Sequence, residues 1–434
     1  MNFERLFSAI KNVNPLKFTG RVSQVKGIRI ESEGPFVEIG TMVTIHTESY
    51  KAFAQVVGFE NGKYILFPFE ENLRISLGSI VEAKAQSSKV AVSEKALGRI
   101  LNCFNEPIDQ SKPIEAEDFI DLYRLPPNPI ARKPITETFE TKIKSIDILL
   151  TAGKGQRLGI FAGAGLGKST LLGMIARHSS ADINVICLVG ERGREVKEFL
   201  ERDLKNGLDK SVVIVSTAEE SSLRKIRAAL LALAYAEYFR DKGRNVLFLC
   251  DSLTRLAQSL RDLKTNLGEI PVARGYPPSC FQFLAKYLER FGNSSGPGTL
   301  TSFFTVLVEG DDLDEPVSDT VKAILDGHIV LSKELAIKGV YPAIDILRSI
   351  SRLADTLQED LTKKISLAIR TLVQTYEENK DLFLVGAYKP GTDITLDTAI
   401  NKYDEILNFL KQLPDEFFTA SEALEEAKKI FRQK

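Results

Sequence analysis

The sequence predicts an α/β protein in which a small β-barrel precedes a parallel sheet and a helical part follows it. Residues 18–90 contain short Val-, Ile- and Phe-rich stretches separated by glycine-containing turns, as in a small barrel. Later apolar runs alternate with helical patterns, and towards the C-terminus only helical patterns remain. We therefore expect four segments, at residues 1–17, 18–90, 91–365 and 366–434.

The first of these segments has the pattern of one short amphipathic helix. Phe3, Leu6, Phe7 and Ile10 follow the spacing i, i+3, i+4 and i+7, and Pro15 ends the pattern. So small an apolar stripe does not form a stable helix alone. Packing on its own domain and docking to a partner or a membrane surface both remain open.

The barrel prediction depends on its turns and its aromatic residues. Asn61-Gly62 separates two apolar stretches and indicates a type I′ hairpin turn. Barrels of this size are sometimes oligonucleotide-binding folds. The aromatic residues alternate with small apolar residues rather than with basic ones, so we expect core packing rather than base stacking. They are Phe53, Phe59, Tyr64, Phe67 and Phe69.

Composition excludes several classes of protein. The 57 Lys and Arg residues against 58 Asp and Glu residues give a net charge of −1, so bulk charge does not attract a polyanion. A content of 44% hydrophobic and 26% charged residues is that of a globular chain, which excludes disorder and collagen. The cysteines are far apart and form no CxxC pair, so we expect buried free thiols in a reducing compartment. They are Cys103, Cys187, Cys250 and Cys280.

No segment has the pattern of a membrane span or a signal peptide. The longest clean apolar run, residues 228–236, lies between Arg227 and Glu237, and a spanning helix needs about 20 apolar residues. The N-terminus carries Glu4 beside Arg5 and lacks both an apolar core and a cleavage site. We expect a cytoplasmic protein.

Near-continuous apolar runs predict the strands of the central sheet. Such runs are typical of strands covered on both faces, as in a parallel α/β sheet. They occupy residues 157–163, 183–190, 211–217, 245–251 and 301–310.

The first of these runs leads directly into a phosphate-binding motif and then a helix. Its glycines let backbone N–H groups turn towards phosphate oxygens at the helix N-terminus. Lys168 would reach the β- and γ-phosphates, and the Ser169 hydroxyl would bind Mg²⁺. The first motif position, usually Gly, is Ala162, which is small enough for the turn. The predicted loop consists of Ala162, Gly163, Ala164, Gly165, Leu166, Gly167, Lys168, Ser169 and Thr170.

Two carboxylates follow other predicted strands. Asp251 ends the run 245–251 and suits the Walker B position, although an Asp there is often only a turn or a helix cap. Glu191 lies just past the run 183–190, where open parallel sheets place ligands, and could accept a proton from water or orient it. The alternative for the GERGRE stretch is the start of a solvated helix.

Several long motifs in the same order resemble one family. The sequence resembles the ATPases of type III secretion, and among them the flagellar protein export ATPases, which are similar to the α and β subunits of rotary ATP synthases. The matching segments are GRILNCFNEPID (98–109), AGAGLGKST (162–170), GERGREV (190–196), CDSLTRLAQ (250–258), ARGYPPSCFQFLAKYLERFG (273–292) and YPAIDILRSISR (341–352).

This resemblance implies a RecA-like P-loop ATPase core and a set of site residues. Glu191 would be the catalytic carboxylate, with Lys168 on the phosphates. Ser169 would bind Mg²⁺ directly, and Asp251 and Glu195 would contact it through water.

The resemblance also implies residues around the γ-phosphate and the base. Arg192 would support the γ-phosphate, and Arg352 would be an arginine finger acting on the neighbouring subunit's nucleotide. Tyr341 matches an adenine-stacking aromatic and Phe383 matches one less closely. Core packing is the alternative for both rings.

The implied function is Mg²⁺-dependent ATP hydrolysis by a homohexamer that assists flagellar protein export, releasing chaperones from export substrates and unfolding them. Implied partners are a stator-like regulatory protein bound through the N-terminal helix, a central stalk-like coiled coil, membrane proteins of the export gate and chaperone–substrate complexes. The protein would lie at the inner membrane as a peripheral cytoplasmic component.

Three alternatives remain open. An injectisome secretion ATPase shares these motifs. An RNA-dependent hexameric motor shares the core and a small barrel, but near-zero charge and the absence of a basic, aromatic-rich stretch before residue 90 disfavour it, so no nucleic acid is expected. A nucleotide-sensing module is disfavoured by Glu191. GERGREVKEF in place of GERTREGND argues against a rotary catalytic subunit.

Overall fold

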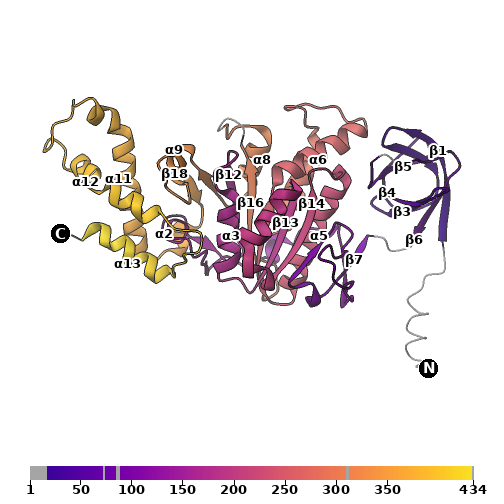
Figure 1. Cartoon of the computed structure of the whole chain (residues 1–434), viewed down its shortest axis with the longest axis horizontal. Coiled ribbons are helices and arrows are strands. Elements are labelled where there is room, and N and C mark those ends of the chain that lie inside the picture. The colour runs from indigo at the N-terminus through magenta and orange to yellow at the C-terminus, as the bar shows by residue number, and fades with distance from the viewer. Residues whose placement is uncertain (1–16, 72–73, 85–87, 309–311, 433–434) are drawn as a thin grey trace, which may run out of the picture.

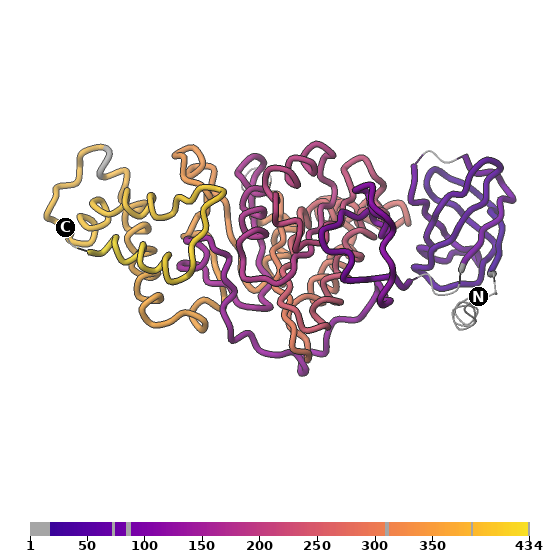
Figure 2. Tube along the Cα trace, turned by 60° about the horizontal axis from the view of Figure 1, so that its bottom comes forward, coloured from indigo at the N-terminus to yellow at the C-terminus, as the bar shows by residue number. Residues whose placement is uncertain are grey.

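The computed structural model describes residues 17–71, 74–84, 88–308 and 312–432. The expected helix over residues 1–17 therefore lies almost entirely outside the described residues. A β-barrel lies at one end of the molecule, a large sheet with its helices lies in the middle, and the C-terminal helices lie at the other end (Figures 1 and 2).

Six antiparallel strands close the N-terminal barrel in the order β1-β2-β5-β4-β3-β6. Asn61 (φ 51°) and Gly62 (φ 76°) form the predicted left-handed turn between two of the strands. Small and β-branched side chains alternate into the barrel interior, which accounts for the apolar pattern. The strands are β1 (Lys17–Lys26), β2 (Arg29–Glu33), β3 (Met42–His46), β4 (Lys51–Glu60), β5 (Lys63–Pro68) and β6 (Ile80–Lys84).

The barrel aromatics do not all pack as expected. Phe67 and Phe69 are buried, but against Leu223 in the central part, so they dock the barrel rather than fill it. Core packing was the wrong expectation for Phe53 and Phe59, which are exposed. A strand alternates its faces whatever the residue type, so an aromatic on the outer face stays in solvent unless another part of the chain covers it, as the central part covers Phe67.

The central sheet has eight strands within the described residues, in the order β18-β17-β12-β16-β15-β13-β14-β8. All five predicted strands are present, and β8, β17 and β18 had not been predicted. The five predicted strands pair in parallel, as expected, and within this sheet the antiparallel pair is that of β17 and β18 at one edge. A short connection that includes α9 (Lys333–Ile337) reverses the chain there without crossing the sheet. The strands are β8 (Arg99–Leu101), β12 (Arg157–Ala162), β13 (Ile183–Glu191), β14 (Ser211–Thr217), β15 (Asn245–Asp251), β16 (Thr299–Leu307), β17 (Gly327–Leu331) and β18 (Ile344–Ser351).

Helices cover both faces of this sheet, which is why its strands are apolar at successive positions. In β13, Val185 and Cys187 enter one hydrophobic core, while Ile186 and Leu188 enter the other. The helices over the first face are α5 (Ser222–Asp241), α6 (Leu253–Asn266), α7 (Pro278–Leu288) and α8 (Pro316–Ile324); those on the second face or at its edges are α2 (Lys144–Leu149), α3 (Lys168–His178) and α4 (Gly193–Glu198).

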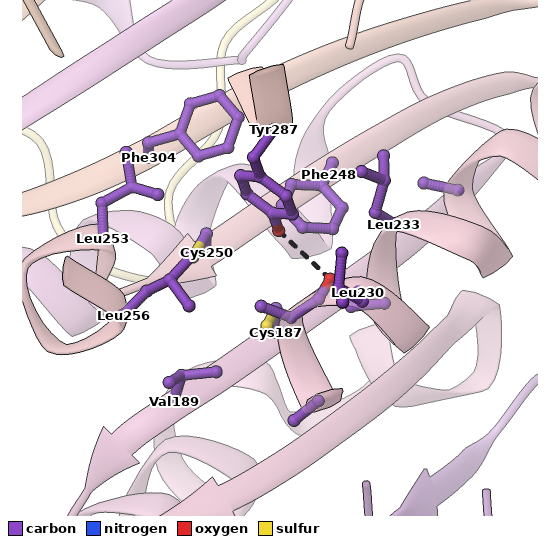
Figure 3. Close-up of a cluster of buried hydrophobic side chains, with 14 of the residues drawn as sticks. Cys187, Val189, Leu230, Leu233, Phe248, Cys250, Leu253, Leu256, Tyr287 and Phe304 are labelled. Atoms are coloured by element: carbon purple, nitrogen blue, oxygen red, sulfur yellow. Dashed lines mark hydrogen bonds between the residues drawn. The ribbon is translucent and has the colours of Figure 1, made fainter. Parts of the chain in front are cut away.

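Figure 3 shows the first core. Tyr287 extends from α7 between the sheet and α5, where its hydroxyl donates a hydrogen bond to the Ala229 carbonyl at 3.2 Å. Cys187 and Cys250 lie on neighbouring strands at this face. All four cysteines are buried and free, as predicted from their spacing.

The C-terminal helices share the second core with the sheet. Ile369 and Ile406 pack in the same cluster as Ile160 of β12. The helices are α11 (Asp360–Leu384), α12 (Ile394–Leu410) and α13 (Ala420–Phe431), preceded by the short α10 (Ala354–Leu357).

Two expected boundaries fall inside structural elements. Residue 366 lies within α11, and residue 90 lies within β7 (Lys89–Val92), which pairs with β9 (Asp118–Asp121) outside the barrel. A change of pattern along the chain locates an element's end only to within a few residues. Within the described residues, no helix is both long and apolar enough to cross a membrane.

Candidate active site

The predicted phosphate loop joins β12 to α3. Gly165 (φ 77°) and Gly167 (φ 82°) have left-handed backbone conformations that other residues rarely adopt, so glycine is required at both positions. Gly167 precedes the first turn of α3, whose N–H groups face a cavity of about 700 Å³. A helix N-terminus with free N–H groups favours an anion at this point.

Most of the predicted loop residues line this cavity, but two do not. Ala162 and Leu166 are buried in the core beneath the loop, so they support its shape. The loop residues that line the cavity are Gly163, Ala164, Gly165, Gly167, Lys168, Ser169 and Thr170.

Lys168 lies between the two predicted carboxylates. Its Nζ is 2.6 Å from Asp251 Oδ1 and 3.9 Å from Glu191 Oε1. Burial alone would lower the pKa of Lys168, but the two carboxylates outweigh burial and raise it above its usual value. The lysine therefore carries a fixed positive charge at the end of the phosphate loop.

Glu191, at the end of β13, has a perturbed acidity. Its burial and the nearby charge of Asp251 raise the pKa of Glu191 to about 8, while Lys168 acts in the opposite direction. A carboxylate with its pKa near neutrality is suited to accept a proton from water. Asp251 in turn accepts a hydrogen bond from the buried Thr305 hydroxyl at 2.7 Å, which holds its carboxylate in place.

The remaining polar residues lie nearer the mouth of the cavity. Arg192 is exposed, and its Nη1 is 3.6 Å from Glu195 Oε1 in the first turn of α4. Sequence reasoning missed Arg255 on α6, which also lines the cavity and packs on Gly190. The sequence did contain a signal for Arg255. It lies in the first turn of the helix that follows Asp251, and that turn leaves the end of the sheet where the phosphate loop lies.

Ser169, Glu195 and Asp251 supply oxygen donors of the kind that Mg²⁺ prefers. Among the described residues, no group of three or more His, Cys, Asp or Glu side chains is arranged to hold a metal alone. Mg²⁺ commonly takes only one or two protein ligands and completes its shell with phosphates and water. The residues present therefore fit an ion bound together with a nucleotide.

A second cavity of about 730 Å³ adjoins the other side of the phosphate loop, with Gly165, Gly167 and Thr170 lining both cavities. Tyr341 lines it, with its ring beside Gly167, and its contact with the base stays a prediction. Phe383 lies in the last turn of α11, and its side chain is outside the described part of the structure.

The opposite wall of the second cavity had not been predicted. It is formed by residues 411–418, between α12 and α13, and includes Phe418. No periodic pattern marks this loop, and only the folding of the C-terminal helices against α2 brings it to the phosphate loop.

Arg352 is not part of this chain's own site. Its N–H donates to the Asp326 carbonyl at 3.0 Å, and Asp326 pairs with Arg157 at the start of β12. The phosphate loop follows the other end of β12, which is roughly 17 Å away at about 3.3 Å per residue. Because β18 runs antiparallel to β17, its C-terminal end lies beside the amino ends of the parallel strands. Arg352 therefore lies at the far edge of the sheet, opposite the phosphate loop.

A glycine-rich loop, a lysine and two carboxylates at one edge of a mainly parallel sheet define a P-loop nucleoside triphosphatase. Comparisons with known proteins identify its family. A model of the ATP synthase alpha/beta family nucleotide-binding domain matches residues 142–351, and a model of the T3SS EscN ATPase C-terminal domain matches residues 360–429.

The similarity extends over nearly the whole chain. The flagellum-specific ATP synthase of Bacillus subtilis is 46% identical over 420 residues, which is 96% of each chain. The type 3 secretion system ATPase of Xanthomonas euvesicatoria is 40% identical over 94% of this chain and 92% of its own. The assembled ATPase EscN of enteropathogenic E. coli superimposes with a TM-score of 0.90 at 37% identity, over 95% of this chain and 100% of EscN. The chain belongs to the family of flagellum-specific and type III secretion ATPases.

Proposed function

We propose that this chain is a flagellar export ATPase that hydrolyses ATP with Mg²⁺ at the first cavity. The observation that carries the proposal is the placement of Lys168, Glu191 and Asp251 around one phosphate loop. The flagellar assignment is supported by the 46% identity to the Bacillus subtilis protein.

The geometry supports a simple division of roles. The loop N–H groups and Lys168 bind the β- and γ-phosphates. Ser169 and Asp251 would hold Mg²⁺, which would offset phosphate charge. Glu191 orients a water molecule whose oxygen attacks the γ-phosphorus. The bond to the bridging oxygen breaks, ADP leaves, and the proton released by water passes to Glu191 or to phosphate.

Arg352 supports a homohexamer as the working form. Because its position at the far edge of the sheet separates it from its own nucleotide, it would complete the site of the next subunit. EscN, which shares this fold, has been solved as an assembled ATPase.

The partners follow from the same family membership. EscN has also been solved in complex with its central stalk EscO, and we infer a corresponding coiled-coil stalk for this protein. Residues 1–17 would bind a stator-like regulator. Export gate proteins and chaperone–substrate complexes would then be met at the cytoplasmic face of the inner membrane.

Secretion assays in the source cell test the proposal. Wild-type, Lys168→Ala and Glu191→Gln chains would be expressed in a strain lacking the gene, and secreted flagellar subunits measured. Both variants should lose ATP hydrolysis and export together. Loss of non-flagellar effector export in both variants, with unchanged motility, would instead assign the protein to an injectisome. Hydrolysis that requires added RNA would contradict both assignments.

A further inference from the structure

The loop of residues 411–418 is attached to the central part at two separate places. It connects α12 to α13 and forms one wall of the second cavity. The residues that attach it are distinct from those that line the phosphate site, so their effect on the base can be separated from catalysis.

The first attachment is Gln412, which is 4% exposed. Its backbone N–H donates to the Tyr341 carbonyl at 2.8 Å. Its side-chain Oε1 accepts from Lys144 N at 3.0 Å, and Nε2 donates to the carbonyls of Lys142 at 2.8 Å and of Glu416 at 3.0 Å. Gln412 therefore ties the loop directly to the aromatic residue expected to contact the base.

The second attachment is Asp415, at the exposed side of the loop. Its Oδ1 lies 2.7 Å from Lys205 Nζ and 3.5 Å from Arg177 Nη2. Arg177 also donates to the Pro414 carbonyl. Arg177 joins the loop to the last turn of α3, the helix that begins at the phosphate loop, while Lys205 begins the short helical segment Lys205–Lys210 before β14.

The two attachments control where an aromatic wall lies. Phe418, at the end of the loop, lines the cavity and has Lys144 Nζ 4.6 Å from its ring centre. Dispersion contacts with a flat base fall steeply when a wall moves outward by even 0.5–1 Å. A loop attached at both Gln412 and Asp415 keeps Phe418 at a constant separation from Tyr341.

We propose that Gln412 and Asp415 are positioning residues that hold the 411–418 loop against Tyr341 and α3, and so set the affinity for the base of the nucleotide. The proposal rests on the ATP site proposed above. It separates base binding, which depends on the loop, from phosphate binding and hydrolysis, which depend on Lys168 and Glu191.

Steady-state ATPase kinetics on the assembled full-length protein test it, with inorganic tripolyphosphate as a competitor that carries phosphates but no base. Gln412→Glu keeps the shape of the side chain but replaces two donated hydrogen bonds with repulsion, so KM for ATP should rise about tenfold. Asp415→Asn should raise it about two- to threefold. Inhibition by tripolyphosphate and kcat at saturating ATP should stay within twofold of wild type.

Matched variants separate this role from a general loss of structure. Asp404→Asn removes a negative charge from the exposed face of α12 and should change nothing. Lys205→Met removes the shorter of the two ion pairs of Asp415, so it should raise KM no more than Asp415→Asn does. The double variant should be no worse than Asp415→Asn, because that substitution already removes both pairs. These surface variants decide the question even if Gln412→Glu does not fold.

Two results would overturn the inference: an unchanged KM for ATP in Asp415→Asn and Lys205→Met, or a loss of tripolyphosphate inhibition equal to the loss of ATP affinity. If the proposed ATP site itself were wrong, Lys168→Ala would hydrolyse ATP at the wild-type rate. That outcome is distinct from the two results above.

Discussion

The ammonium of Lys168 lies 2.6 Å from the carboxylate of Asp251, so the predicted phosphate lysine and the predicted Walker B residue form one buried ion pair. Lys168 begins α3 after the loop that follows β12, and Asp251 ends β15. They are brought together because the carboxyl ends of these parallel strands lie at the same end of the sheet. This pair connects the phosphate loop to the residue proposed to hold the metal.

Replacing Lys168 with Met should reduce kcat/KM for ATP at least about 100-fold, because the variant loses a charge that stabilises the transferred phosphoryl group. Lys197→Met removes an exposed lysine from α4 and should leave the rate within twofold. Initial-rate assays with purified protein measure both. Equal rates for the two variants would contradict the role given to Lys168.

Replacing Thr305 with Val should lower kcat about tenfold and raise the Mg²⁺ concentration needed for half-maximal rate, because the Asp251 carboxylate loses the hydrogen bond that orients it. Thr305→Ser keeps the hydroxyl and should retain the activity. Ser302→Ala is a control on the same strand, since the Ser302 hydroxyl is buried without a hydrogen-bond partner. A Mg²⁺ titration that is the same in all three variants would show that Thr305 only packs.

Arg352→Ala and Glu191→Gln should each abolish hydrolysis when assembled alone, with losses of about 10³–10⁵-fold for the arginine. Mixed assemblies should recover part of the activity, because some interfaces then pair an intact Glu191 with an intact Arg352. Turnover is measured across mixing ratios. Absence of recovery at every ratio would place Arg352 outside the neighbouring site.

A stability prediction concerns the buried pair of Arg290 and Glu237. Arg290 donates two hydrogen bonds of 2.9 Å to this carboxylate and one of 2.6 Å to the Leu122 carbonyl. Arg290→Met removes both hydrogen bonds of 2.9 Å from the buried Glu237 carboxylate and leaves Arg124 Nη1 3.7 Å away, so it should lower the free energy of unfolding by about 3 kcal/mol. Lys428→Met, which breaks an exposed pair with Glu425, should cost less than about 1 kcal/mol. Urea denaturation of both variants provides the comparison.

Local patterns in the sequence were sufficient to predict several features. The five apolar runs correspond to β12 to β16, and Asn61-Gly62 forms the expected turn. Lys168, Glu191 and Asp251 lie together as predicted. Each of these depends on residues close in the chain, or on the rule that parallel strands place their carboxyl ends at one edge.

Other features depended on contacts between distant segments. Phe418 reaches the second cavity only because the C-terminal helices share a core with β12. Phe59 is aromatic but faces solvent, and nothing in residue type reveals which face of a barrel strand is outside. The direction of β18 was not predictable from its apolar pattern, which is the same in either orientation.

The sequence by itself determined the phosphate loop, the strand runs and the two acidic residues, because backbone geometry and hydrophobic periodicity are local properties. Only the tertiary structure decided that Lys168 pairs with Asp251, that Arg352 lies at the far edge of the sheet and that residues 411–418 close the second cavity. These three depend on strand order and on helix packing, since burial of apolar surface selects among arrangements that the local pattern leaves equally possible.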